Sequence, residues 1–154
     1  MLMAKGCNML NNKDYCDYDT CVALKELGYI GQGRLYYAPD KDPNELKHFG
    51  IQVLTTRSAE ALNFVLAVPL FDAQKWLREE KRICVEVDCC AGGYVWELCK
   101  AYHKDWFSGG TTIYTHCCED NAINPLLNDC GKYDSYEEAL LEGIKEAVKI
   151  LVED

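Results

Sequence analysis

The chain is short of basic residues and has no long apolar run. No apolar stretch approaches the roughly 20 residues that a helix needs to cross a bilayer, so we expect no membrane partner. Sixteen Lys and Arg residues stand against 25 Asp and Glu residues, for a net charge of −9, and they form no basic run. Because nucleic-acid binding relies on Lys and Arg at the phosphates, we also expect no nucleic-acid partner.

The sequence also lacks the short motifs that identify many enzymes. Its three histidines, His48, His103 and His116, lie in no G-x-S-x-G, H-E-x-x-H or phosphate-loop pattern. His116 stands beside Cys117 and is the candidate for a Cys–His pair, but a structural role is the simpler interpretation. We therefore predict no catalytic residue and no cofactor, and favour a non-enzymatic function.

Cysteine, by contrast, is abundant, with ten residues. The first residues, MLMAKGCNMLNNKDYC, show no secretory signal, so we expect a cytoplasmic protein with mostly reduced thiols. No two cysteines form a C-x-x-C pair, which removes the usual zinc-ribbon and thioredoxin signatures. A composite zinc site of Cys99, His116 and Cys118 stays open as an alternative.

The segment Val68–Val87 changes from a helical to a strand pattern. Its apolar residues recur at helical spacing as far as Lys81 and then alternate from Ile83 onward. This pattern predicts a helix that leads into a strand through a turn of one or two residues.

A hairpin follows, with Gly92-Gly93 as a two-residue turn. This turn places Val87 opposite Leu98 and Cys89 opposite Trp96 on the core face. The outer face then carries Cys84, Glu86, Asp88, Val95, Glu97 and Cys99. Asp88 is expected to lie opposite Glu97 as a like-charge pair. That these carboxylates simply belong to a solvated outer face is a simpler interpretation than a functional cluster.

Weaker patterns predict the remaining elements. Strands are expected at 34–38, 49–54 and 111–117, a turn at 39–44, and a strand ending at Val68 within 58–68. Asp19 or Thr20 is expected to cap a short helix that ends at Leu27.

The C-terminal helix has the clearest pattern. Ser135 and Glu138 form a capping box, an apolar stripe continues to Leu151, and Gly143 marks a close approach to the sheet. We therefore predict an irregular segment over 1–18 and one α+β domain over 19–154. Its two layers are a mainly antiparallel sheet of about five strands and two longer helices on one face, besides the short N-terminal helix.

Three segments resemble a known family. AQKWLREEKRICVEV (Ala73–Val87) and YDSYEEALLEGIKEAVKIL (Tyr133–Leu151), preceded by YDTCVALKELGY (Tyr18–Tyr29), are similar to small uncharacterised proteins from phages and prophages of gut Bacteroidales. That family usually has Pro-Thr before the Trp helix, where this chain has Val68-Pro69-Leu70. The resemblance implies a phage or mobile-element accessory protein in the host cytoplasm. It implies no chemistry, so no functional residue is carried over.

A non-catalytic binding protein that modulates or inhibits a host protein or defence system is the function we expect. The acidic charge and the aromatic residues of predicted loops, Tyr15 and Tyr18 among them, favour a binding surface. The candidate binding residues are Tyr102, Trp106, Phe107, Tyr114, His116, Glu86, Asp88 and Glu97.

Two alternatives stay open. The first is sequestration of a small nucleotide-type signal, for which Arg34, Arg57 and Lys104 are the basic residues near predicted loops or strand ends. A homo-oligomer would be able to build such a pocket between subunits. The second alternative is a small zinc-binding or Cys-dependent protein.

Overall fold

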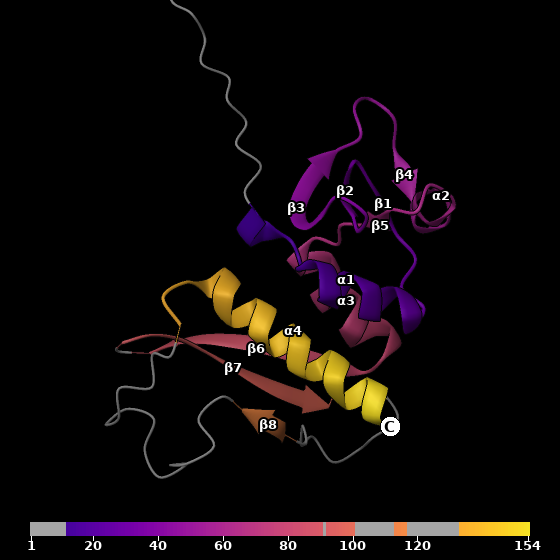
Figure 1. Cartoon of the computed structure of the whole chain (residues 1–154). Helices are drawn as coiled ribbons and strands as arrows, with labels where there is room; N and C mark the ends of the chain where they lie inside the picture. Colours follow the sequence, from indigo (N-terminus) through magenta and orange to yellow (C-terminus); the bar gives the residue numbers. More distant parts are fainter. Residues whose placement is uncertain (1–11, 91, 101–112, 117–132) are drawn as a thin grey trace, which may run out of the picture.

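The computed structural model describes residues 12–90, 92–100, 113–116 and 133–154. They form helices and antiparallel strands, so the predicted α+β class is confirmed (Figure 1). The helices are the 3-10 helix η1 (Asn12–Asp14) and the α-helices α1 (Tyr18–Glu26), α2 (Thr56–Ala61), α3 (Leu70–Glu80) and α4 (Tyr136–Glu153). The strands are β1 (Gln32–Gly33), β2 (Leu35–Ala38), β3 (Asp42–His48), β4 (Leu54–Thr55), β5 (Val65–Leu66), β6 (Ile83–Cys90), β7 (Gly93–Lys100) and β8 (Ile113–His116).

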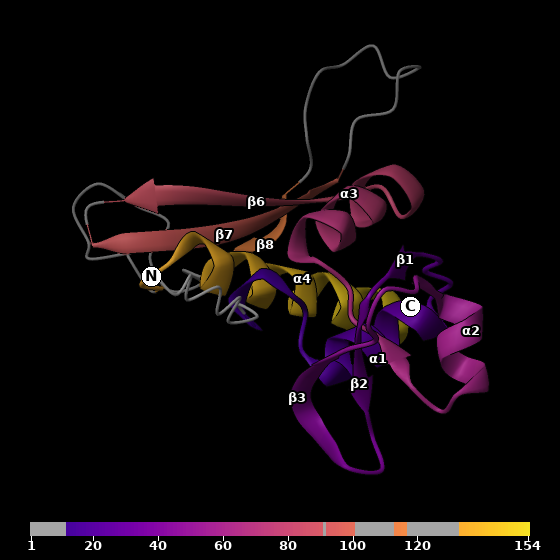
Figure 2. The ribbon, with the colours of Figure 1, turned by 90° about the horizontal axis from the view of Figure 1, so that it is seen from above.

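The strands form three small sheets rather than the one sheet of about five strands that we expected. β6, β7 and β8 pair in that order, β3, β2 and β5 form a second sheet, and β1 pairs with β4. With two residues each, β1, β4 and β5 are too short to carry one continuous sheet across the molecule. Helix α1 packs against both α4 and β5 and so joins the two parts, which Figures 1 and 2 show on either side of it.

The predicted change from helix to strand is confirmed. Pro69 precedes α3 without a side-chain cap, which fits proline at a helix start because its missing N–H is not needed there. The helix ends at Glu80, and Arg82, at φ 60°, turns the chain into β6. The chain therefore reverses within two residues, and α3 lies alongside the strand that follows it.

The hairpin register differs from the prediction by two residues. Val87 lies opposite Trp96 and Cys89 opposite Tyr94, so β6 extends to Cys90 and Gly93 already belongs to β7. Gly93 has a φ of 148°, a value that suits glycine, which lets it continue the ladder opposite Cys90. Because side chains alternate along a strand, a shift of two leaves the predicted faces unchanged.

Helix α4 follows the prediction closely and covers one face of the β6–β7–β8 sheet (Figure 2). The Ser135 hydroxyl accepts a hydrogen bond from the Glu138 backbone N–H at 3.2 Å, which caps the helix with one half of the predicted capping box. A Cβ on Gly143 would lie 2.6 Å from Val85 Cγ1 and 3.2 Å from Trp96 Cβ. The absence of a side chain at Gly143 is therefore what allows α4 to lie this close to the sheet.

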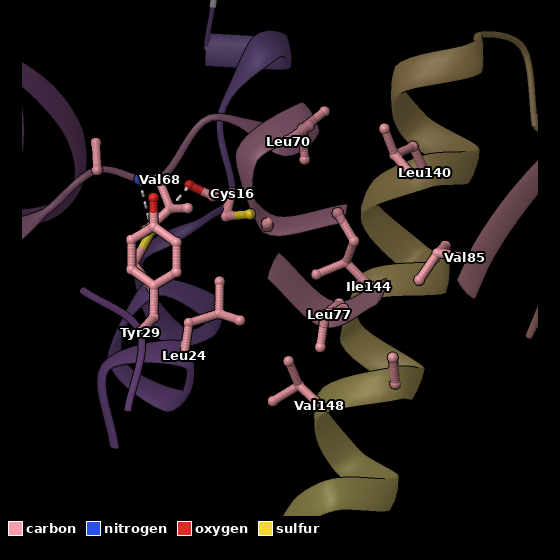
Figure 3. Packing of buried hydrophobic residues seen from close by; sticks show 14 of the residues in the cluster. Cys16, Leu24, Tyr29, Val68, Leu70, Leu77, Val85, Leu140, Ile144 and Val148 are labelled. Carbon is pink, nitrogen blue, oxygen red and sulfur yellow. Dashed lines mark hydrogen bonds between the residues drawn. The ribbon is translucent and has the colours of Figure 1, made fainter. Parts of the chain in front are cut away.

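One core cluster reaches from the first helix to the last. Leu70 and Leu77 of α3 face Ile144 and Val148 of α4, and Leu24 of α1 lies beside them (Figure 3). Leu77 is fully buried.

Trp76 lies at the border of this core. It is half-buried and packs edge-on against Tyr29, with 5.7 Å between the ring centroids. The Lys81 amine lies 5.1 Å from the Trp76 ring centroid.

Several local predictions in the first half of the chain are wrong. Asp17, rather than Asp19 or Thr20, caps α1, because its carboxylate accepts the Thr20 backbone N–H at 3.0 Å. The expected turn at 39–44 is shorter, since β3 already begins at Asp42. The strand expected at 49–54 is reduced to its last residue, because Gly50, at φ 83°, turns the chain away.

The segment 58–68 contains both a helix and a strand. Thr55 and Ser58 form a capping box, which starts α2, and Asn63, at φ 57°, ends the helical course. Only β5 is extended, so the strand that we expected here is two residues long and stops short of Val68.

The chain after β5 is tied to the segment ahead of α1, because the Cys16 backbone N–H donates a hydrogen bond to the Val68 carbonyl at 2.9 Å.

Candidate functional site

The outer face of the β6–β7 hairpin brings together most of the described candidate residues. Glu86 lies directly opposite Glu97, and Asp88 lies opposite Val95, so the expected Asp88–Glu97 pair is wrong. Glu86 and Asp88 are exposed, whereas Glu97 is half-buried. None of the three carboxylates forms an ion pair with a residue in the described part of the chain. The face is therefore strongly acidic, with one like-charge pair at its centre.

Two cysteines extend this face toward the start of the hairpin. Cys84 lies opposite Cys99, and this pair is the neighbour of the Glu86–Glu97 pair on the same face of the sheet. Cys99 is only 3% exposed, and its Sγ lies 3.7 Å from Glu97 Oε1. One ligand atom from each of Glu86, Glu97 and Cys99 lies within 4.8 Å of the others. The face thus combines hard oxygen and soft sulfur donors in one small area.

Both thiols are held in the protonated form. Burial raises the pKa of Cys99 to about 11, and the negative charges of Glu97 and Glu86 add to the effect. Burial also raises the pKa of Cys84, as does Glu86, while the Arg78 guanidinium acts in the opposite direction. Since the thiolate is the reactive form, this environment is opposite to that of an activated cysteine nucleophile.

We expect Cys99 to resist alkylation at neutral pH. Its raised pKa leaves almost no thiolate below pH 9, and the thiolate fraction rises only as the pH approaches about 11. Iodoacetamide labelling of the native protein across this pH range, read by peptide mass spectrometry, measures the profile. Cys89, which is exposed on the neighbouring strand β6, is the internal control for reagent access. Equal labelling of Cys99 and Cys89 at neutral pH would contradict the expectation.

Removing one charge of the central pair should stabilise the fold slightly. We expect Glu86→Gln to raise the free energy of unfolding by about 0.5 kcal/mol, because directly opposed like charges are unfavourable on a sheet. Urea titrations at low and high salt measure the gain, which should shrink as salt screens the repulsion. Glu26→Gln, at an exposed position on α1, serves as the matched control. No gain over that control at low salt would mean that the pair is already neutralised.

A hollow of about 340 Å³ lies beside the outer face, at the edge of β6. Its lining comes from three elements: α3, the edge strand β6 and the first residue of α4. The lining residues are Gln74, Arg78, Cys84, Val85, Glu86, Val87, Asp88 and Tyr136. Sequence patterns indicated the acidic residues, but the hollow itself depends on how α3 docks beside the strand.

Tyr136, the aromatic residue in the lining of the hollow, packs against two further aromatic side chains. Tyr136 stacks on Phe71 of α3 at 6.2 Å between ring centroids and meets Tyr94 of β7 edge-on at the same distance. Phe71 is 55% exposed, unusually open for a phenylalanine. These three residues were not predicted as site residues, because Tyr136 fits the apolar stripe of α4 and the others carry no distinguishing pattern.

The remaining predicted residues lie elsewhere. Tyr102, Trp106, Phe107, Lys104 and Cys118 lie outside the described residues. Tyr114 and His116 belong to β8, where His116 lies opposite Glu97 in the register. Arg34 and Arg57 are exposed in the first half of the chain and do not line the hollow at β6.

A second hollow, of about 400 Å³, lies between α1 and α4 and has two lysines, Lys145 and Lys149, in its lining. Lys145 is already paired, at 3.0 Å from Asp17 and 2.9 Å from Glu142. Burial favours the neutral amine, but hydrogen bonds to these two carboxylates raise the pKa of Lys145 overall. Because Lys145 is already paired with two carboxylates, it is less available to a phosphate than an unpaired lysine would be.

None of the described helices is both long and apolar enough to cross a lipid bilayer. No protein-family model, curated protein or solved structure matches the chain.

Proposed function

We propose that the chain is a non-catalytic binding protein that recognises a basic partner protein through the outer face of β6 and β7. One observation carries the proposal: Glu86, Asp88 and Glu97 gather on this face without an ion pair to any described residue. The resemblance to phage accessory proteins makes a host protein or defence component the class of partner proposed.

Electrostatics explains why such a face suits a basic partner. Opposed carboxylates repel each other in the free protein, and a cationic side chain placed between them relieves that repulsion. The net charge of −9 acts in the same direction at longer range and speeds encounter with a cationic surface. Binding of this kind weakens as ionic strength rises.

Affinity capture tests the proposal. The full chain, immobilised, is exposed to an extract of gut Bacteroidales cells, in parallel with a Glu86→Gln, Asp88→Asn, Glu97→Gln variant. The matched control, Glu26→Gln, Glu80→Gln, Glu153→Gln, removes the same charge from exposed positions elsewhere. We expect a basic protein to be retained by the wild type and the control and lost with the acidic-face variant. Recovery by all three proteins, or by none, would contradict the proposal.

A second candidate function, metal binding, has an observation of its own. The ligand atoms of Glu86, Glu97 and Cys99 lie within 4.8 Å of one another, and Cys84 lies opposite Cys99. Thiolate and carboxylate ligands together suit zinc, and binding would release the Cys99 proton.

Metal analysis of the purified chain and calorimetric titration with zinc test this alternative. We expect Cys99→Ala to abolish stoichiometric binding and Cys89→Ala, on the exposed part of the same hairpin, to preserve it. A chain that takes up no zinc, or takes it up equally after Cys99→Ala, has no metal site on this face.

A further inference from the structure

Among the strands that the structure describes, β6 forms an edge of its sheet, with β7 on one side only. The Val85 carbonyl accepts a hydrogen bond from the Gln74 side chain of α3 at 2.7 Å, so it points away from β7. Backbone groups of an antiparallel strand point alternately toward and away from its partner. The N–H and C=O groups of Val87 and Cys89 therefore also point outward.

The neighbouring strand gives independent support for this orientation. Tyr94, which lies opposite Cys89, exchanges both backbone hydrogen bonds with Tyr133, at 2.9 and 3.2 Å. The N–H and C=O of Tyr94 are thus directed away from β6. Cys89 and Tyr94 therefore form a cross-strand pair that exchanges no hydrogen bonds, and the backbone groups of Cys89 also point away from β7. Within the part of the chain that the structure describes, nothing bonds to the outward groups of Val87 and Cys89.

The two sides of this open edge differ in chemistry. On the outer side, Glu86 and Asp88 present exposed carboxylates. On the inner side, the exposed Phe71 ring stacks on Tyr136. Successive side chains of a strand point to opposite faces, so a strand beside β6 would place every second side chain against each of these surfaces.

We propose that the partner binds by adding an extended segment as a further strand beside β6. This inference rests on the proposed function. The segment alternates basic and apolar side chains. The basic ones lie over Glu86 and Asp88, and the apolar ones enter the 340 Å³ hollow against Tyr136, on which Phe71 stacks. The outward groups of Val87 and Cys89 supply the main-chain hydrogen bonds, as in other cases of strand addition.

A second copy of the chain fits this edge poorly. Pairing two β6 strands edge to edge would set Glu86 and Asp88 near the same carboxylates of the other copy, and like charges close together across strands are destabilising. The charge of Arg78 acts on Cys84, near the start of β6, whereas Asp88 lies near the other end of the strand, so Arg78 gives little relief at Asp88. Charge complementarity therefore selects a basic segment of another protein.

Binding of synthetic peptides to the full chain tests strand addition directly. The probe is a short acetylated and amidated peptide of alternating Lys and Val, compared with a peptide of the same composition in which the Lys and Val residues are grouped into blocks. A third peptide carries N-methyl groups on alternate amides. We expect the alternating peptide to bind at least about tenfold more tightly than either of the others, because register and main-chain hydrogen bonds both contribute. Equal affinities would overturn the proposal.

A single backbone substitution provides the matched protein variant. Cys89→Pro removes an outward N–H at an exposed edge position, where proline is tolerated, whereas Cys89→Ala keeps that N–H. We expect the alternating peptide to lose about tenfold in affinity for the Pro variant and to bind the Ala variant as it binds the wild type. If the Pro variant fails to fold by circular dichroism, the N-methylated peptide alone decides the question.

The same two variants separate this proposal from the proposed function. If the basic protein captured from extract is lost with Cys89→Pro and kept with Cys89→Ala, strand addition is supported. If both variants capture it equally, strand addition is wrong while the binding function stands. If the wild type captures nothing, the binding function itself fails. Dimerisation of the chain alone, abolished by Cys89→Pro, would show that a second copy occupies the edge and would overturn the proposal.

Discussion

Gly143→Val should lower the free energy of unfolding by about 3 kcal/mol, which makes it one of the most damaging single substitutions in the chain. The new Cβ would lie 2.6 Å from Val85 Cγ1, well inside contact distance. Neither neighbour gives way easily, because Val85 is 2% exposed and Trp96 8% exposed. Urea unfolding followed by circular dichroism measures the loss. Because valine has a higher helix propensity than glycine, propensity does not explain the loss, and Lys149→Val measures the effect of a valine at an exposed position of the same helix.

The smaller change Gly143→Ala sharpens the same test. Alanine favours the helix by about 1 kcal/mol over glycine, so a helix limited by propensity alone would become more stable. We expect a net loss instead, because the clash with Val85 outweighs that gain. In a Val85→Ala background the clashing methyl group is absent, and Gly143→Ala should then be neutral or stabilising. Stabilisation of the wild-type background by Gly143→Ala would contradict the close approach.

The sequence was most informative where one periodicity extends over many residues. The apolar stripe from Ala139 to Val148 can face only one surface, and the Ser135 cap fixes where α4 begins. The change of period at Lys81 likewise predicted the sharp reversal between α3 and β6. Gly143 stood out because glycine inside a strong helix is unfavourable unless a neighbour requires the space.

Short elements were predicted less well, because their boundaries depend on contacts distant in the sequence. Leu54 and Leu66 share a small second cluster with Ala59, and it is this packing that gives β4, α2 and β5 their places. We predicted Gly92-Gly93 as the turn, and nothing local indicated that Gly93 would instead join the ladder. Because the predicted register was wrong by two residues, the carboxylate opposite Glu97 is that of Glu86 and not, as predicted, that of Asp88.

The candidate site was predictable in part. Alternation alone placed Glu86, Asp88 and Glu97 on one face, and this assignment holds in any register shifted by an even number. The hollow was not predictable, because it exists only where Gln74 and Tyr136 meet the edge of β6. Periodicity assigns a residue to a face, whereas an edge and its surroundings follow from how separate elements pack.

Leu77→Ala should lower the free energy of unfolding by about 3 kcal/mol, within the range for a fully buried leucine. Leu77 is 0% exposed and lies between α1 and α4 in the central cluster (Figure 3). Phe71→Ala, in the same helix, is the matched control. It deletes a larger side chain that is 55% exposed, and we expect it to cost about 1 kcal/mol or less. A larger loss from Phe71→Ala than from Leu77→Ala would contradict this assignment of the buried face of α3.

The same substitution tests whether the two parts of the molecule unfold together. Leu77 belongs to the cluster that contains both Leu35 of β2 and Leu98 of β7, so a cavity at Leu77 weakens the packing that the two sheets share. Hydrogen exchange of the Leu77→Ala variant should therefore accelerate by a similar factor in β2 and in β7. Acceleration in β7 alone would show that the first half of the chain is a separate cooperative unit. Because α1 contacts both α4 and β5, we expect the two sheets to respond as one unit.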